Sequence, residues 1–138
     1  MLGQGGMAVV YAVTHTDLGS QHALKVLAIP SPAIRERLMA EGRAQARLRH
    51  PNLVAVDDVL DLDGMPALIM ERIDGPTLDA WLLNDSARDL AVALGLFRGI
   101  LCGVGAAHAA GLVHRDLKPS NILLQTTPGG WVPKVMDF

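Results

Sequence analysis

The chain is poor in cysteine and has little net charge, and both shortages exclude classes of protein. Cys102 is the single cysteine among 138 residues, so no disulfide can form within the chain, which fits a reducing compartment. It lies in an apolar segment, where we expect a buried structural thiol. Twelve basic and fourteen acidic residues give a formal net charge of −2. That balance provides no electrostatic basis for binding nucleic acid or an anionic membrane.

The N-terminus also lacks the pattern of a secretory signal, because it opens with glycines instead of a basic region and an apolar core. No internal repeat and no low-complexity tract is visible. Half of the residues are hydrophobic and 19% are charged, which argues against disorder and for a domain with a hydrophobic core. We expect a cytoplasmic location. This expectation does not concern a membrane anchor outside this segment.

One apolar segment, Leu90 to Leu112, is about long enough to cross a membrane. Gly95, Gly99 and Gly103 repeat the small-residue spacing of packed membrane helices. Arg98 lies near its middle, however, where a charge would be costly in a bilayer. Apolar residues also recur at helical spacing, at Leu90, Leu94, Phe97, Leu101 and Val104. We therefore expect a buried helix of a soluble domain and no membrane span.

Groups suited to phosphoryl transfer are concentrated in one run, His114-Arg115-Asp116-Leu117-Lys118-Pro119-Ser120-Asn121. Transfer from a nucleotide requires a positioned hydroxyl, neutralised phosphate charge and bound metal ions. The carboxylate of Asp116 can orient a hydroxyl and accept its proton. Lys118 would lie on the same side of an extended loop and face the phosphate. Asn121 offers a neutral oxygen suited to Mg²⁺.

This run resembles the catalytic loop of the eukaryotic-type protein kinase family, His-Arg-Asp-Leu-x-x-x-Asn. Lysine two positions after Asp116 is similar to the serine/threonine branch. The opening Leu-Gly-x-Gly-Gly-Met resembles bacterial members. A polar loop with chance carboxylates is the alternative, and the agreement along the whole run argues against it.

A glycine-rich opening and a lysine-bearing strand precede the loop. The opening contains Gly3, Gly5 and Gly6, and glycines let backbone amides approach phosphate oxygens closely. The strand His22-Ala23-Leu24-Lys25 follows and resembles the kinase strand whose lysine pairs with the α- and β-phosphates. The family's third loop glycine is Ala8 here, which would at most stiffen the loop or weaken nucleotide affinity.

A buried lysine charge requires a partner, and Glu41 is the candidate for Lys25. Glu41 lies in a helix that we expect to begin near Ser31-Pro32 and to end before His50-Pro51. Its distance from that second pair is similar to the spacing of the kinase αC glutamate. An exposed glutamate on a helix surface is the alternative. Gly42 weakens this helix by about 1 kcal/mol relative to alanine.

Two further segments resemble the rest of a kinase nucleotide site. In the strand from Met65 and the turn that follows, Met70 would lie beside the adenine, and the backbones of Glu71 and Ile73 would hydrogen bond to it. An ordinary core strand is the alternative. The last residues resemble the strand leading into the Asp-Phe-Gly motif. Asp137 would then bind the Mg²⁺ that bridges the phosphates, and Phe138 would pack near His114.

The resemblance implies ATP and Mg²⁺ (or Mn²⁺) as cofactors and a protein with Ser/Thr hydroxyls as substrate. It assigns catalytic roles to Lys25, Glu41, Asp116 and Lys118. It assigns metal binding to Asn121 and Asp137. It assigns nucleotide binding to Gly3, Gln4, Gly5, Gly6, Val10, Ala23, Lys25, Met70, Glu71, Ile73 and Leu123.

We expect an α+β chain with a two-lobed fold similar to that of protein kinases. Residues 1–74 would form a small lobe, an antiparallel sheet with one helix, and residues 75–138 the start of a largely helical lobe. Nucleotide would bind in the cleft between the lobes. Strands are expected at Leu2–Gly5, Met7–Thr14, Gln21–Leu27, Val54–Leu62, Met65–Glu71, Ile122–Leu124 and Val132–Met136. Helices beyond the one carrying Glu41 are expected at Leu78–Leu83 and Ser86–Ala110.

The expected activity is ATP-dependent phosphoryl transfer to Ser/Thr hydroxyls of proteins. One alternative is a non-catalytic nucleotide-binding or interaction module, or a fragment without its own function, because the 138 residues hold no activation segment or peptide-binding platform. The missing helices would also leave apolar surface uncovered and favour self-association. Another alternative is a small-molecule kinase of the aminoglycoside or choline type, against which Lys118 and the His50-Pro51-Asn52 run argue.

These 138 residues by themselves should transfer little phosphate, because the segments that would bind a protein substrate are not among them. Transfer of ³²P from labelled ATP to a generic protein substrate measures this, with Asp116→Asn as the control. Robust turnover that depends on Asp116 would contradict the expectation.

Overall fold

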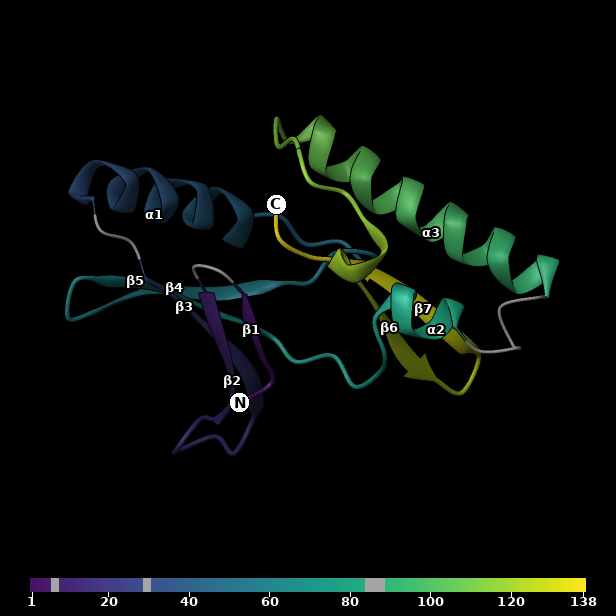
Figure 1. Cartoon of the computed structure of the whole chain (residues 1–138), viewed down its shortest axis with the longest axis horizontal. Coiled ribbons are helices and arrows are strands. Elements are labelled where there is room, and N and C mark those ends of the chain that lie inside the picture. The colour runs from purple at the N-terminus through teal and green to yellow at the C-terminus, as the bar shows by residue number, and fades with distance from the viewer. Residues whose placement is uncertain (6–7, 29–30, 84–88) are drawn as a thin grey trace. The chain divides into compact units, whose positions relative to one another are not determined.

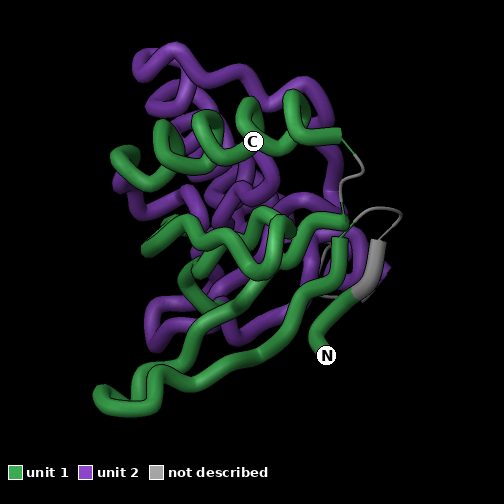
Figure 2. Tube along the Cα trace, turned by 90° about the vertical axis from the view of Figure 1, so that its left-hand side faces the viewer, with its two compact units in different colours: residues 1–48, 55–72 green, residues 49–54, 73–138 purple. Residues whose placement is uncertain are grey.

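The structure is a computed structural model that describes residues 1–5, 8–28, 31–83 and 89–138 (Figure 1). It separates into two compact units, which Figure 2 colours differently. The first comprises residues 1–48 and 55–72, and the second comprises residues 49–54 and 73–138. The division into lobes at residue 75 stays a prediction.

The first unit contains a five-stranded antiparallel sheet in the order β1-β2-β3-β5-β4. Its strands are β1 (Gly3–Gly5), β2 (Ala8–Thr14), β3 (Gln21–Leu27), β4 (Val56–Leu62) and β5 (Met65–Glu71). The predicted bounds of β3 and β5 are confirmed. The strand predicted from Val54 begins two residues later, because the amide of Val54 instead donates to the carbonyl of Val135 at 2.9 Å. Met7, predicted to begin β2, lies outside the described residues.

The helix of the first unit, α1 (Pro32–Ala46), begins at the predicted Ser-Pro pair and packs on β4 and β5. Gly42 is buried at this contact. A β-carbon there would lie 2.8 Å from Leu68 Cδ2 and 3.3 Å from Val59 Cγ2. Glycine therefore lets the helix approach the sheet closely, a role in packing that the sequence alone did not reveal.

The second unit combines two helices with a β-hairpin. Its elements are α2 (Leu78–Leu82), α3 (Leu90–Ala109), the 3₁₀ helix η2 (Pro119–Asn121), β6 (Ile122–Thr127) and β7 (Gly130–Val135). β6 and β7 pair antiparallel, and Leu53 forms a parallel bridge to Val135. The core of the hairpin is almost wholly buried at Leu53, Ile122, Leu124 and Val135.

The helix α3 begins at Leu90 because the side chain of Asp89 caps it, accepting a hydrogen bond from the amide of Ala91 at 2.8 Å. The predicted start at Ser86 lies outside the described residues. The helix is long and apolar enough to cross a membrane by length and composition, a property that core helices of soluble proteins share. It packs against β7, so one side of it faces protein.

The face of α3 that packs is not the face predicted. Leu96, Gly103 and Ala107 are buried, whereas four large residues of the predicted stripe are between 54% and 71% exposed: Leu90, Leu94, Phe97 and Leu101. The prediction of a buried helix was thus wrong for this stripe, and Cys102 is likewise exposed instead of buried.

Close approach by small residues explains the choice of face. A β-carbon at Gly103 would lie 2.6 Å from the backbone oxygen of Asn52, and one at Gly99 would lie 2.6 Å from Pro133 Cγ. Because leucine at either position would hold the helix away, the glycine side packs and the leucine side does not. Asn52 completes the contact by donating from Nδ2 to the carbonyl of Pro133 at 2.9 Å.

Gly95→Ala and Gly103→Ala form a matched pair of substitutions within α3. A β-carbon at Gly95 meets nothing within 4 Å, so alanine should stabilise the unit by about 1 kcal/mol through helix propensity. At Gly103 the same carbon overlaps backbone, and overpacking of about 1–3 kcal/mol should exceed that gain. Urea unfolding followed by circular dichroism measures both, and effects of the same sign would contradict the assignment of faces.

Candidate active site

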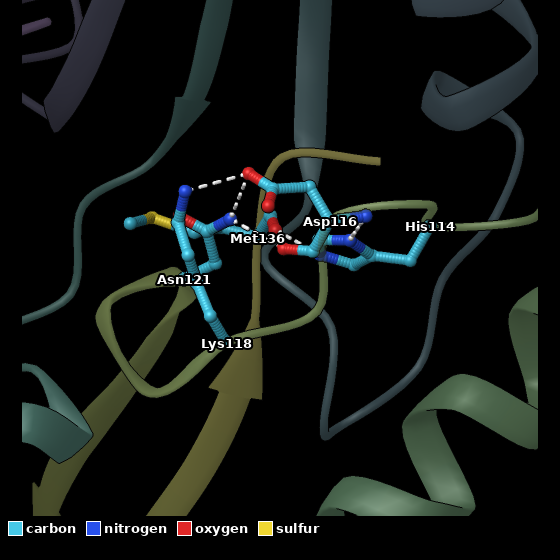
Figure 3. A network of polar contacts seen from close by, with 5 residues as sticks. All are labelled: His114, Asp116, Lys118, Asn121 and Met136. Atoms are coloured by element: carbon cyan, nitrogen blue, oxygen red, sulfur yellow. Dashed lines mark hydrogen bonds and ion pairs between the residues drawn. The ribbon is translucent and has the colours of Figure 1, made fainter.

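The predicted catalytic run lies in the second unit and is tied to the end of β7 by His114 (Figure 3). His114 is 6% exposed, and its Nε2 lies 2.8 Å from the carbonyl oxygen of Met136. Because a carbonyl only accepts, Nε2 carries the hydrogen and Nδ1 is left to accept from the amide of Asp116 at 3.3 Å. The ring also contacts Phe138, with centroids 4.7 Å apart, which confirms the predicted proximity.

Three predicted site residues meet at the carboxylate of Asp116 (Figure 3). Lys118 Nζ donates to Oδ2 at 2.7 Å, and Asn121 Nδ2 donates to the same oxygen at 3.3 Å. Asn121 Nδ2 also donates to the backbone carbonyl of Asp116 at 2.9 Å. Asn121 is buried, whereas the side chains of Lys118 and Asp116 are exposed. The carboxylate of Asp116 is therefore hydrogen bonded to a buried amide and remains accessible to solvent.

These contacts act on the ionisation of Asp116. The hydrogen bond from Lys118 is the largest cause that holds the pKa of the carboxyl below its ordinary value of 3.8, and the Asn121 amide adds to it. The group is therefore ionised at neutral pH and can act only as an acceptor there.

The backbone of Met136 joins the two predicted metal ligands. Its amide donates to the carbonyl of Asn121 at 3.0 Å, and Asp137 follows it directly. Because Asn121 Nδ2 donates to Asp116, its amide oxygen is the atom suited to a hard cation. Among the described residues no group of three or more His, Cys, Asp and Glu side chains could hold a metal by itself.

The backbone of the site is strained at two points. Three non-glycine residues of the described chain have a positive φ, and two of them are Arg115 (62°) and Asp137 (65°). Such residues persist only where the surrounding structure holds them, and they concentrate at active sites.

Predicted nucleotide residues of the first unit share one face of the sheet. Val10 is the register partner of Lys25, and Ala23 is the partner of Met70. Gly3 pairs with Val10 in turn. Directly opposed residues, and residues two apart on a strand, project to the same face. The sheet register therefore brings these five residues to one surface.

The remaining predicted residues of the glycine-rich opening are placed only by their backbone. Gln4 pairs with Val9, and Gly5 pairs with Ala8. Gly6 lies outside the described residues.

The helix α1 covers the same sheet face. Leu68 is the other register partner of Lys25, and it contacts Gly42, the neighbour of Glu41. The carboxylate of Glu41 accepts from Arg37 Nε at 3.0 Å, one helical turn before it. The predicted ion pair between Lys25 and Glu41 stays a prediction, and sequence reasoning missed the Arg37 contact although the i, i+4 spacing signalled it.

Contacts at the end of β5 decide which Glu71 group could meet an adenine. The Glu71 amide donates to the carbonyl of Ala55 at 2.9 Å, so the predicted adenine contact would run through the Glu71 carbonyl. Ile73 begins the main part of the second unit, and Leu123 lies on β6 of that unit.

Comparison with known proteins identifies relatives of this arrangement. The family model "Protein kinase domain" matches residues 1–138. The probable serine/threonine-protein kinase SCO3848 of Streptomyces coelicolor is 42% identical, over 100% of this chain and 21% of that protein. The probable serine/threonine-protein kinase PknB of Corynebacterium glutamicum is 37% identical, over 100% and 22%. The chain thus spans about a fifth of the length of these curated relatives.

Solved structures confirm the predicted kinase-like fold. Rad53 1–466 in complex with AMP-PNP matches 99% of this chain and 36% of its own, with a TM-score of 0.87 and 26% identity. A double mutant of the Mycobacterium tuberculosis PknI kinase domain matches 100% and 56%, with a TM-score of 0.82 and 28% identity.

Lys118→Met should raise the pKa of Asp116 toward its ordinary value, because the largest cause of its lowering is removed. A lowered pKa means that the wild-type carboxylate stays ionised at a pH where the variant is already partly protonated. Titration of the Asp116 carboxyl ¹³C resonance measures the difference. Arg115→Met, which removes a neighbouring charge from the same loop, is the control, and an equal rise in both variants would contradict the assignment to Lys118.

Proposed function

This chain belongs to the protein kinase family, and we propose that it supplies the ATP-binding and catalytic-loop part of a serine/threonine protein kinase. The observation that carries the proposal is the network in which Lys118 and Asn121 both donate to the carboxylate of Asp116. It brings a base, a cation for phosphate and a candidate metal ligand together within one loop.

Asp116 acts as the base in this proposal. Its carboxylate accepts a hydrogen bond from the serine or threonine hydroxyl and takes the proton as the oxygen bonds to the γ-phosphorus. The bond from that phosphorus to the departing ADP oxygen breaks, so the phosphoryl group and the proton are both accounted for. Asp116 is ionised at neutral pH, as a group must be before it can accept a proton.

Lys118 neutralises charge on the transferring phosphoryl group. Its Nζ lies 2.7 Å from Asp116 Oδ2, which supports this role, because the attacking hydroxyl would bind at the same carboxylate. A lysine at this position supports Ser/Thr hydroxyls of a protein as the acceptor.

The metal would be held by the Asn121 amide oxygen and the Asp137 carboxylate. Both are hard oxygen donors, which fit Mg²⁺ or Mn²⁺, and two protein ligands are enough where nucleotide phosphates complete the coordination. A bound Mg²⁺ would neutralise charge on the phosphate oxygens. The positive φ of Asp137 turns the chain directly after β7, immediately beyond the Met136 amide that bonds Asn121.

The first unit would bind the nucleotide through the sheet face that carries Lys25. Lys25 would pair with the α- and β-phosphates, and the backbone of Gly3, Gly5 and Gly6 would approach the phosphate oxygens. Ala23 and Met70 are apolar register partners on this face, which supports an apolar contact for adenine. Val10 would contribute to the same ring contacts, and the backbone of Glu71 to its hydrogen bonds. A cytoplasmic location, where ATP is abundant, completes the proposal.

Self-association is a second proposal, favoured by the exposed stripe Leu90, Leu94, Phe97 and Leu101. Four large apolar side chains along one helix face form a contiguous surface of the kind that marks an interface. Size-exclusion chromatography with light scattering tests this proposal. The wild type should elute as an oligomer, and the double variant Leu94→Lys, Leu101→Lys should elute as a monomer.

ATP with Mg²⁺ should raise the melting temperature of the chain, and Lys25→Met should abolish that rise. Asp116→Asn should keep the rise, because Asp116 is assigned to catalysis and not to nucleotide affinity, yet it should abolish any phosphoryl transfer. Differential scanning fluorimetry with and without ATP and Mg²⁺ separates the two variants. If the well-folded wild type shows no rise in melting temperature with ATP and Mg²⁺, the nucleotide-binding proposal is wrong.

A further inference from the structure

The segment that follows β5 is bound to β6 as a short additional strand of the second unit. The amide of Thr126 donates to the carbonyl of Asp74 at 3.2 Å, and the amide of Leu124 donates to the carbonyl of Pro76 at 2.9 Å. Thr77 forms an antiparallel bridge to Leu123. Residues 74–77 therefore run alongside β6, on the edge that β7 leaves unpaired.

Gly75 makes this contact possible. A β-carbon at this position would lie 1.7 Å from the backbone oxygen of Leu124 and 2.9 Å from its carbonyl carbon. A neighbouring side chain could rotate to make room for the β-carbon, but the atoms that it would overlap are backbone atoms of a buried strand. The φ of Gly75 is not positive, so the position requires glycine for space and not for conformation.

The strand that Gly75 contacts continues directly from the catalytic loop. β6 begins at Ile122, immediately after Asn121, whose side chain donates to Asp116. The helix α2, which begins at Leu78, packs on both η2 and β6, and its Trp81 is 3% exposed. Residues 74–77 are thus hydrogen bonded to β6, and α2 packs on η2 at the C-terminal end of the catalytic loop.

The same segment continues from the predicted adenine contact, because Ile73 lies two residues before Gly75. We propose that Gly75 is a positioning residue, which holds Ile73 and the Asn121 end of the catalytic loop in one backbone register. Any larger residue would separate residues 74–77 from β6 and release both ends. This inference rests on the proposed function for the role of Ile73 and Asn121 in binding nucleotide and metal.

The experiment compares Gly75→Ala with Gly129→Ala in the 138-residue chain. Gly129 lies in the turn of the same hairpin, and a β-carbon there would meet only Thr127 Oγ1 at 3.9 Å. A second variant, Thr126→Pro, removes the donor to Asp74 at an exposed position and leaves Gly75 in place, and it serves if Gly75→Ala does not fold. Hydrogen exchange at the Asn121 and Leu124 amides reports the register, and calorimetric titration with ATP and Mg²⁺ reports nucleotide affinity.

Trp81 provides a third signal. The chain has two tryptophans, and the other, Trp131, is 36% exposed, so Trp131→Phe leaves Trp81 as the single reporter of the α2 contact. Acrylamide quenching in this background measures how exposed Trp81 becomes when α2 separates from the loop.

Gly75→Ala should speed hydrogen exchange at the Asn121 and Leu124 amides and expose Trp81 to the quencher. It should also weaken ATP affinity about tenfold or more, as the loss of one to two net backbone hydrogen bonds implies. Thr126→Pro, if it is used instead, should have the same effects. Gly129→Ala should change none of these. Unchanged exchange at Asn121, or faster exchange with unchanged ATP affinity, would overturn the positioning role. A wild type that binds no ATP would instead contradict the proposed function, and exchange at Asn121 would still decide whether Gly75 sets the register of the loop.

Discussion

The backbone of Met136 is the point on which the arrangement of the catalytic loop depends. Its carbonyl accepts from the buried His114 ring, and its amide donates to the carbonyl of Asn121. These two bonds attach both ends of the loop to the end of β7, which is itself held by Leu53 and the hairpin core. Because the loop is short and has little secondary structure of its own, its side chains can be ordered only by such an anchor.

A second constraint is the close approach of backbones, which glycines permit at three contacts. Gly42 lets α1 approach the sheet, Gly103 lets α3 approach Asn52, and Gly75 lets residues 74–77 pair with β6. In each case a β-carbon would overlap a neighbour, and overlap in a close-packed interior displaces whole elements. Glycine is required at these positions because it has no side chain, and not because its backbone is conformationally free.

The electrostatics of the loop follow from that anchoring. Asp116 is exposed to solvent, where a single ion pair contributes little to folding stability. Its contacts with Lys118 and Asn121 therefore matter for the orientation of the carboxylate and for its pKa, which they lower. Strain at Arg115 and Asp137, on either side of this network, shows that packing elsewhere compensates for an unfavourable local backbone.

The sequence by itself determined the family, the bounds of β3 and β5, and the residues that meet at Asp116. These are short-range features, because residues within one loop or one strand are placed by spacing and pleat alone. Tertiary structure decided which face of α3 is buried and why Gly75 must be glycine. The apolar pattern of α3 predicted one face, and the other is buried because Asn52 and Pro133 approach the glycine side closely. These partners lie 34 or more positions away in the chain from the glycines they contact.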